Sequence, residues 1–179
     1  MSTILENKSQ KLKIEEIKSD PLRVLFVCSG NTCRSPMAAA VLSDRGRKSE
    51  FCTMCTPEMM KKRRIIASSA GLSAVDGMPI SKNAEMALRD AGIRVLPDND
   101  YPNHRAKRVS LSDLMTNDII VGISSRHTMA LISYYPSLAS KIISMDEDIP
   151  DPFGGDLDDY KACLGKICAS IDRMFFYEK

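Results

Sequence analysis

A marked excess of charge of one sign is lacking: 25 Lys and Arg residues face 23 Asp and Glu residues, a formal net charge of +2 over 179 residues. Such a small net charge gives no indication of a polyanionic partner, so nucleic acid is not expected. Long apolar runs are lacking too, because none approaches the roughly 20 residues of a membrane span and the first residues carry no apolar signal segment. We therefore expect a cytoplasmic protein that does not contact a membrane.

Internal repeats and low-complexity tracts are likewise lacking, and a composition of 44% hydrophobic and 27% charged residues is typical of a globular domain. Residues 1–20 are rich in Lys, Glu and Ser without a lasting apolar period, so we predict a flexible N-terminal arm there. Residues 21–179 are expected to form a single domain. In a reducing compartment the six cysteines are expected to be free thiols.

Short apolar segments alternate with segments of helical spacing after residue 20. Buried strands are predicted at 22–27, 64–68, 118–122 and 141–144. Helices are predicted at 35–42, 80–91, 111–116, 125–134 and 157–176, the first with Ser35 as N-cap and Pro36 at its first position. The alternation predicts an α/β fold whose parallel sheet is covered on both faces, with ligands bound beyond the carboxyl ends of the strands.

The first strand leads into the first helix through a seven-residue loop, Cys28-Ser-Gly-Asn-Thr-Cys-Arg34. A loop of this kind turns backbone N–H groups inward, and the helix dipole adds partial positive charge, which together favour a bound anion. Gly30 permits the torsions of a tight wrap, and the guanidinium of Arg34 can donate to two phosphate oxygens. The same field favours the thiolate of Cys28, which predicts a nucleophile beside a phosphate. The alternative is a buried structural cysteine.

The run Cys28-Ser-Gly-Asn-Thr-Cys-Arg-Ser-Pro-Met-Ala38 closely resembles the signature of the low-molecular-weight protein tyrosine phosphatases. The resemblance extends from Leu22 to about Phe176. It implies the phosphotyrosine protein phosphatase I-like fold, a three-layer α/β/α arrangement with a four-stranded parallel sheet. It also implies hydrolysis of phosphorylated proteins through a cysteinyl-phosphate intermediate, with inorganic phosphate as product and with no cofactor or metal.

The roles of the family's loop residues carry over to matching positions. Cys28 is expected to attack phosphorus, Arg34 to clamp the phosphoryl oxygens, Asn31 to shape the loop and Ser35 to hydrogen-bond the thiolate. The remaining phosphate-loop residues are Ser29, Gly30, Thr32 and Cys33. In relatives the second loop cysteine, here Cys33, can form a reversible disulfide with the nucleophile, and simple packing is the alternative.

Phosphoryl transfer to sulfur expels a poor leaving group, so an acid must protonate that group. The stretch from Asp146 to Asp156 offers several carboxylates between Pro and Gly residues, and chemistry alone leaves the choice open, with a solvated acidic turn as the alternative. Asp151-Pro152 followed by an aromatic resembles the family's acid loop. The resemblance implies that Asp151 is the general acid and Phe153 a wall of the substrate slot.

Two further segments resemble family features. Ser68-Ser-Ala-Gly71 resembles the stretch that follows the second strand, and His104 with Ala106 resembles a His-x-Ala segment whose histidine supports the loop asparagine. We therefore expect His104 to hold Asn31 without taking part in catalysis.

The chain departs from tyrosine-directed relatives at Thr32, where they usually carry an aliphatic residue, and at Gly154, where they carry a second aromatic. Threonine at this loop position resembles the branch that acts on phosphoarginine, in which the hydroxyl is thought to recognise the guanidinium side. Phe153 can still stack on a phenyl ring. Phosphotyrosine and phosphoarginine both remain candidate substrates, and Thr32 as neutral variation is the alternative.

Other readings are disfavoured by the residues themselves. Cys52 and Cys55 supply only two zinc ligands, and Cys163 and Cys168 do not share a helix face well. The basic run 61–64 suits either a solvated loop or attraction of acidic phosphopeptides. An arsenate reductase needs two cysteines after the third strand, and residues 122–129 contain none. A module that only binds phosphate would need neither a nucleophile nor an acid.

Overall fold

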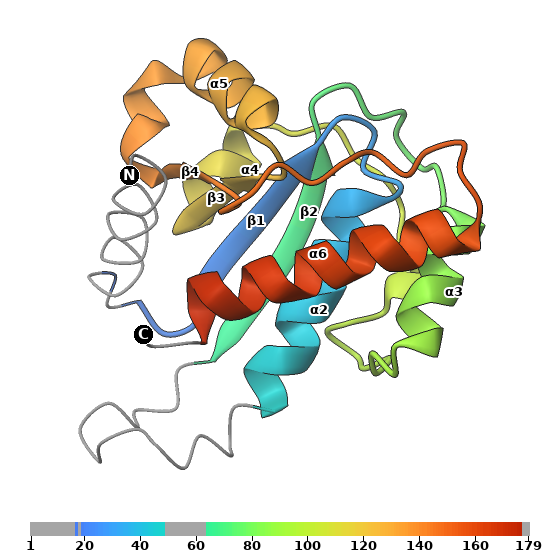
Figure 1. Cartoon of the computed structure of the whole chain (residues 1–179). Helices are drawn as coiled ribbons and strands as arrows, with labels where there is room; N and C mark the ends of the chain where they lie inside the picture. Colours follow the sequence, from blue (N-terminus) through green and yellow to red (C-terminus); the bar gives the residue numbers. More distant parts are fainter. Residues whose placement is uncertain (1–16, 18, 49–63, 177–179) are drawn as a thin grey trace, which may run out of the picture.

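The computed structural model describes residues 17, 19–48 and 64–176 of the chain. Within these residues a four-stranded sheet lies at the centre, with strands in the order β2-β1-β3-β4 and every neighbouring pair parallel. The predicted α/β fold with a four-stranded parallel sheet is therefore confirmed. The strands are β1 (Leu22–Cys28), β2 (Ile65–Gly71), β3 (Ile119–Gly122) and β4 (Ile142–Ser144) (Figure 1).

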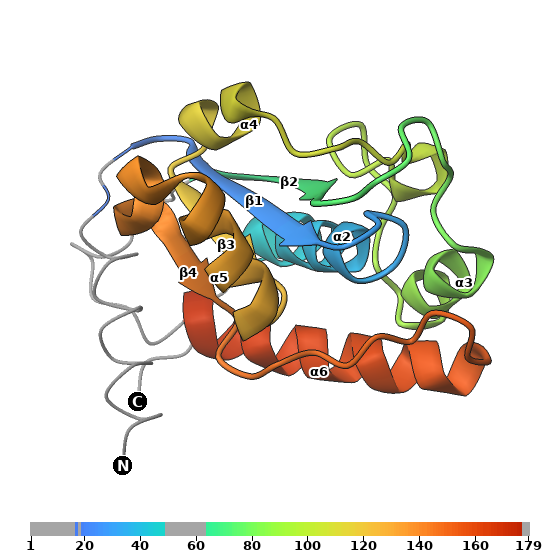
Figure 2. The ribbon, with the colours of Figure 1, turned by 90° about the horizontal axis from the view of Figure 1, so that it is seen from above.

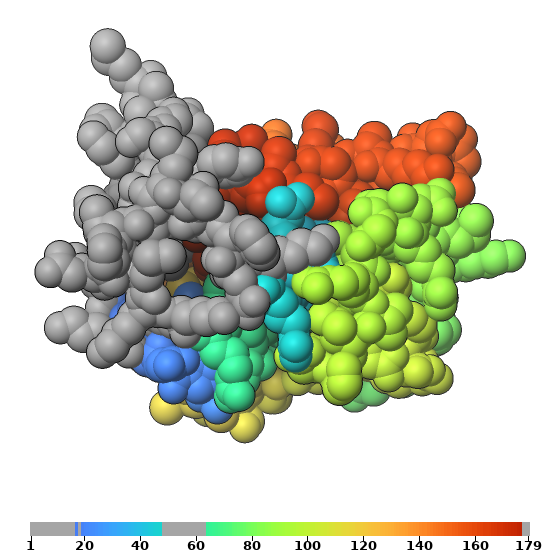
Figure 3. Space-filling view, turned by 90° about the horizontal axis from the view of Figure 1, so that it is seen from below, coloured from blue at the N-terminus to red at the C-terminus, as the bar shows by residue number. Residues whose placement is uncertain are grey.

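Helices cover both faces of this sheet and complete three layers (Figure 2). One side carries α2 (Arg34–Lys48), α3 (Lys82–Asp90) and α6 (Leu157–Phe175), and the other carries α4 (Leu111–Thr116) and α5 (Ser125–Tyr134). Seen from below, α6 lies alongside α3 and α2 (Figure 3). The start of α3 is thereby brought close to the start of α6.

Alternate residues of β1 point to opposite faces, so this strand contributes to both cores. Val24 and Phe26 pack with α2 and α6, whereas Leu25 and Val27 pack with α4 and α5. All four are fully buried, as expected for a central strand of a parallel sheet. Cys28 continues the first series, so its side chain lies on the α2 and α6 side at the carboxyl end of β1.

Element boundaries differ from the predicted ones next to the loop that follows β1. The first helix begins at Arg34, and its first turn closes when Met37 N–H donates to Cys33 O at 3.1 Å. The prediction that Ser35 caps this helix is wrong, because Ser35 lies inside the first turn and its hydroxyl is used elsewhere. β2 continues to Gly71 because its last residues pair with the end of β1. The 3₁₀ helices Tyr101–Asn103 and Pro136–Lys141 were not predicted.

Several sequence predictions fall on residues outside the described part of the chain. They are most of the N-terminal arm, Cys52, Cys55 and residues 61–63 of the basic run. Ile17 is described, and its half-buried side chain packs against the core on the α2 and α6 side. Among the described helices, none is both long and apolar enough to cross a membrane.

Candidate active site

The loop between β1 and α2 has a backbone held by the residues that follow β2. Leu72 N–H donates to Cys28 O and Ser73 N–H donates to Ser29 O, each at 2.9 Å. Gly71 makes this approach possible, because a Cβ at that position would lie 2.6 Å from Ser29 O and 3.0 Å from Asn31 N. Asn31 turns the chain with a φ of 56°, in the left-handed region that asparagine tolerates better than most residues.

The Cys28 thiol lies at the bottom of the wrapped loop and is only 2% exposed. Asn31 N–H donates to its Sγ at 3.3 Å, and the Ser35 hydroxyl lies 3.0 Å from the same sulfur. The Ser35 hydroxyl also lies 3.3 Å from Ala70 O, which fixes it at the base of the loop. The sulfur therefore has one backbone donor, Asn31 N–H, and one hydroxyl, that of Ser35, at hydrogen-bonding distance at the base of the loop.

Asn31 is supported through every polar atom of its side chain. Its Nδ2 donates to Ser35 Oγ at 3.0 Å and to Ser69 Oγ at 2.9 Å, and its Oδ1 accepts from Lys107 N–H at 2.9 Å. Its carbonyl oxygen lies 2.8 Å from His104 Nε2, and burial lowers the pKa of this histidine. A neutral His104 therefore donates to the carbonyl of Asn31 and holds this turn of the loop.

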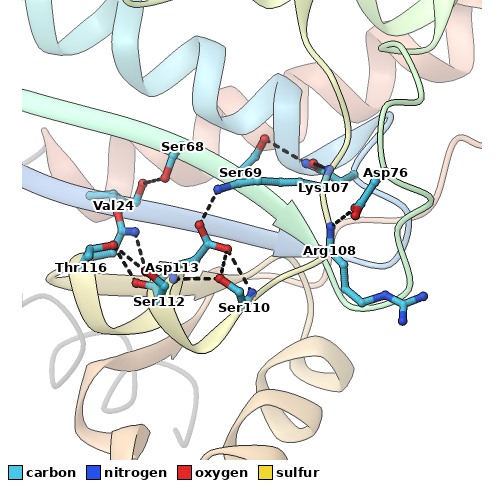
Figure 4. A network of polar contacts seen from close by, with 12 residues as sticks. Val24, Ser68, Ser69, Asp76, Lys107, Arg108, Ser110, Ser112, Asp113 and Thr116 are labelled. Atoms are coloured by element: carbon cyan, nitrogen blue, oxygen red, sulfur yellow. Dashed lines mark hydrogen bonds and ion pairs between the residues drawn. The ribbon is translucent and has the colours of Figure 1, made fainter.

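The segment that carries Lys107 is itself anchored to its surroundings (Figure 4). The Lys107 ammonium pairs with Asp113, which closes a capping box with Ser110 at the start of α4. Asp76 accepts from Arg108 N–H at 2.7 Å. These contacts fix the backbone on which the position of Asn31 depends.

Arg34 and Asp151 meet across the mouth of the loop. The Arg34 side chain is 4% exposed, its NH1 donates to Ile149 O at 3.4 Å, and its NH2 forms an ion pair with the Asp151 carboxylate. The Nε–H of Arg34 is buried and has no hydrogen-bond partner within the described residues. Asp151 is the partly open member of the pair, with 45% of its side chain exposed.

The loop that carries Asp151 is a tight turn with an exposed tip. Gly154 has a φ of 86°, and Gly155 N–H donates to Pro152 O at 2.9 Å. Phe153 at the tip is 79% exposed, so its ring is available to a substrate rather than packed in the core. At the other end, the buried Cys163 thiol donates to Pro150 O at 3.6 Å.

His127 is a site residue that sequence reasoning missed. Its Nε2 lies 3.0 Å from Ser29 Oγ and its Nδ1 lies 2.7 Å from Ser124 Oγ, so α5 holds the first half of the loop. Burial, followed by the charges of Arg34 and Arg126, lowers its pKa to about 4. The only signal in the sequence was a histidine one turn into a helix that follows a strand end.

The low pKa of His127 makes the stability of the protein depend on pH. Between pH 6.5 and about 4 the unfolded chain binds a proton at this position and the folded chain does not, so the free energy of unfolding falls as the pH is lowered. We expect up to about 3 kcal/mol from this group, at about 1.4 kcal/mol for each unit of pKa. Urea unfolding at several pH values, with His127→Gln as the reference, measures it. Parallel pH profiles of the two proteins would contradict the prediction.

The other cysteines of the described residues lie in the phosphate loop and on α6. Cys33, Cys163 and Cys168 are free thiols, as is Cys28. The Sγ of Cys33 lies 3.3 Å from the hydroxyl of Tyr160. Burial raises the pKa of Cys163 to about 12, so it stays protonated. The described residues contain no cluster of three or more potential metal ligands.

A wrapped loop with a buried thiol, an arginine and a facing aspartate can be compared with known proteins. A family model described as low molecular weight phosphotyrosine protein phosphatase matches residues 23–178. The chain belongs to this family. The predicted family, and with it the enzyme class of phosphatase, is confirmed, and the family acts on phosphorylated substrates.

Members of this phosphatase family with different named activities are similar to the chain. A protein-arginine-phosphatase from Geobacillus stearothermophilus is 30% identical over 161 residues, covering 86% of this chain and 94% of the relative. The low molecular weight protein-tyrosine-phosphatase PtpB from Staphylococcus epidermidis is 30% identical over 162 residues, covering 87% and 98%. The crystal structure of a low molecular weight protein tyrosine phosphatase from T. tengcongensis has 33% identity and a TM-score of 0.72, covering 85% of this chain and 96% of that chain.

Proposed function

We propose that this phosphatase hydrolyses phosphotyrosine in proteins through a covalent phosphate on Cys28. The observation that carries the proposal is that one loop holds both the buried Cys28 thiol and the buried Nε–H of Arg34, which has no hydrogen-bond partner among the described residues. A buried donor without an acceptor costs about 1–3 kcal/mol. An oxygen of a bound phosphate would accept from this Nε–H, and the inward backbone N–H groups of the loop would bind the other oxygens.

In the first step the thiolate of Cys28 attacks phosphorus, so an S–P bond forms while the P–O bond to the tyrosine breaks. In this structure Asp151 pairs with Arg34 as a carboxylate. A bound phosphate would take its place on the guanidinium, and the protonated form of Asp151 would then give its proton to the leaving oxygen. Arg34 stays charged throughout and stabilises the negative charge on the transferring oxygens. The products of this step are a tyrosine side chain and a phosphocysteine.

In the second step the Asp151 carboxylate takes a proton from water, and the water oxygen attacks phosphorus. The S–P bond breaks, its electron pair returns to Cys28 as thiolate, and inorganic phosphate leaves with Asp151 again protonated. Asn31 N–H donates to the sulfur, and Ser35 Oγ lies at hydrogen-bonding distance from it. Both contacts would stabilise the sulfur as a leaving group in this step.

Phosphoarginine is a second candidate substrate, and Thr32 is the observation that favours it. Thr32 is half-buried in the loop, with its hydroxyl 3.5 Å from Cys33 Sγ. A hydroxyl can accept a hydrogen bond from a guanidinium, which an aliphatic side chain cannot. The exposed Phe153 ring favours phosphotyrosine instead, because it can stack on a phenyl group.

Phosphate release from matched phosphotyrosine and phosphoarginine peptides under reducing conditions tests the proposal. Cys28→Ser protein serves as the blank, because the P–N bond of phosphoarginine also hydrolyses without enzyme. Release from phosphotyrosine that depends on Cys28 supports the first candidate, and release from phosphoarginine alone supports the second. No release from either peptide would contradict both.

Replacing Thr32 by isoleucine is expected to lower the ratio of phosphoarginine to phosphotyrosine turnover about tenfold, the effect of about 1.4 kcal/mol from one lost hydrogen bond. The measurement is kcat/KM with both peptides. Thr32→Val, which keeps the shape and removes only the hydroxyl, is expected to move the ratio in the same direction. An unchanged ratio in both variants would make Thr32 incidental to specificity.

A further inference from the structure

The first turn of α3 contacts both loops of the proposed mechanism, although it belongs to neither. Ser81 N–H donates to Thr32 O in the phosphate loop at 2.8 Å. Two residues later, Asn83 Nδ2 donates to Gly155 O in the acid loop at 3.2 Å. One helical turn therefore touches the loop of the nucleophile and the loop of the acid.

Ser81 occupies the N-cap position of α3, yet its side chain makes no capping hydrogen bond. A serine at this position ordinarily accepts from a free backbone N–H and thereby stabilises the helix. Here the hydroxyl donates to the hydroxyl of Tyr160 on α6 at 3.0 Å. The helix forgoes its cap, and the hydrogen bond holds the start of α6 instead.

Tyr160 completes a closed circuit of contacts. Its hydroxyl accepts from Ser81, and the same oxygen lies 3.3 Å from Cys33 Sγ, next to Thr32 in the phosphate loop. Burial, followed by the neighbouring Cys33, raises its pKa to about 12, so the phenol is neutral. Because Tyr160 ends the first turn of α6, just after the acid loop, it links that loop to the half of the phosphate loop that carries Cys33.

The acid loop needs such a support because its tip is open to solvent. Two hydrogen bonds hold its first half: the Arg34 guanidinium donates to Ile149 O, and the Cys163 thiol donates to Pro150 O. Its second half is held by Asn83 on Gly155 O, and Gly155 is tightly seated, since a Cβ there would lie 2.3 Å from Asp159 Oδ2. Asp151 lies between these two anchors, so its distance from the phosphate loop depends on both.

We propose that three positioning residues set the distance between the Cys28 nucleophile and the Asp151 acid. They are Ser81 and Asn83 at the start of α3 and Tyr160 on α6, and together they are called the bracket. The inference rests on the proposed function, because it concerns proton donation to the leaving group. Attack by sulfur and protonation of the leaving atom must occur on opposite sides of phosphorus. A misplacement of about 1 Å in such an arrangement can cost about 100-fold in rate.

The consequence is a loss that depends on the leaving group. When the phenol of an aryl phosphate is acidic, it leaves as a phenolate and needs no proton. The kcat/KM for such a substrate is therefore expected to change less than twofold in Asn83→Ala. A phosphate ester of a weakly acidic phenol needs the proton of Asp151, and its kcat/KM is expected to fall about tenfold. Tyr160→Phe is expected to act in the same direction. The Ser81→Ala/Tyr160→Phe double variant should lose no more than Tyr160→Phe alone, because both remove one shared hydrogen bond.

The experiment measures kcat/KM for a series of aryl phosphates with graded leaving groups in each variant. Met86→Ala, on the exposed side of α3, is the matched control and should keep the wild-type slope. Thermal unfolding and inhibition by inorganic phosphate report whether fold and phosphate loop are intact. A steeper slope in Asn83→Ala and Tyr160→Phe, with unchanged phosphate inhibition, is the expected result.

Three results overturn the inference. If Asp151→Asn steepens the slope and the bracket variants do not, the bracket does not position the acid and the proposed function survives. If Asp151→Asn leaves the slope unchanged, the acid assignment fails and the inference fails with it. A uniform loss across all leaving groups in Tyr160→Phe would show a merely structural role.

Discussion

Replacing Cys28 by serine is expected to lower kcat at least about 1,000-fold, the scale on which loss of a nucleophile reduces turnover in enzymes that form covalent intermediates. The sulfur lies within hydrogen-bonding distance of Asn31 N–H and Ser35 Oγ, and the proposed mechanism uses it as the attacking nucleophile. A serine hydroxyl ionises far less readily than a thiol and stays protonated in the same place. Phosphate release from a phosphotyrosine peptide measures the loss.

Cys168→Ser is the matched control, because this half-buried thiol lies in the second half of α6 and away from the loop. It is expected to retain wild-type turnover. Acid quenching of the wild-type enzyme during turnover, followed by mass spectrometry, should also find phosphate on the peptide that contains Cys28. Normal turnover by Cys28→Ser would refute the mechanism.

Replacing Asp151 by asparagine is expected to lower turnover of phosphotyrosine by about 100- to 10,000-fold, the range that general acid catalysis supplies. Asparagine keeps the shape of the side chain and can still lie against Arg34, but it cannot donate a proton as a carboxylic acid does. The loss should shrink as the leaving group becomes more acidic. Rapid-quench measurement of the first turnover separates the phosphorylation of Cys28 from its hydrolysis.

Asp148→Asn provides the comparison for that experiment. Asp148 is a carboxylate of the same segment, but it accepts from Ser125 N–H at 2.6 Å and from Ser125 Oγ at 2.9 Å at the start of α5. Its replacement is expected to affect stability more than the dependence on leaving group. If Asp151→Asn and Asp148→Asn changed the dependence of turnover on the leaving group to the same extent, Asp151 would not be the acid.

Sequence patterns could predict the layers of the fold because each strand is a short apolar run and each helix has a regular apolar spacing. They also placed Cys28 and Arg34 at one loop, since the carboxyl end of a strand and the start of the next helix are adjacent in any parallel α/β fold. They could not choose Asp151 among its neighbouring carboxylates. That choice depends on which carboxylate the turn at Gly154 brings onto Arg34.

The supports of the site were harder to predict, because they act through contacts distant in sequence. Ser69, Lys107 and His127 reach the phosphate loop from three different segments of the chain. The hydrogen bonds of Ser69 and His127 are ones that any serine or histidine could form. Lys107 acts through its backbone N–H, so its residue type carries no signal for that role. Ser81 occupies an N-cap position, but its hydroxyl donates to Tyr160 on another helix, a contact that no local pattern indicates.

Gly71 shows that the shape of the phosphate loop is determined in part from outside the loop. Because any Cβ at this position would press on Ser29 O, a chain could carry every residue from Cys28 to Ser35 and still be unable to adopt this curvature. The loop sequence therefore predicts this loop conformation only when a glycine stands at the matching position of the neighbouring strand. A search for enzymes of this kind, or a design that transplants the loop to another scaffold, has to include that empty space as part of the motif.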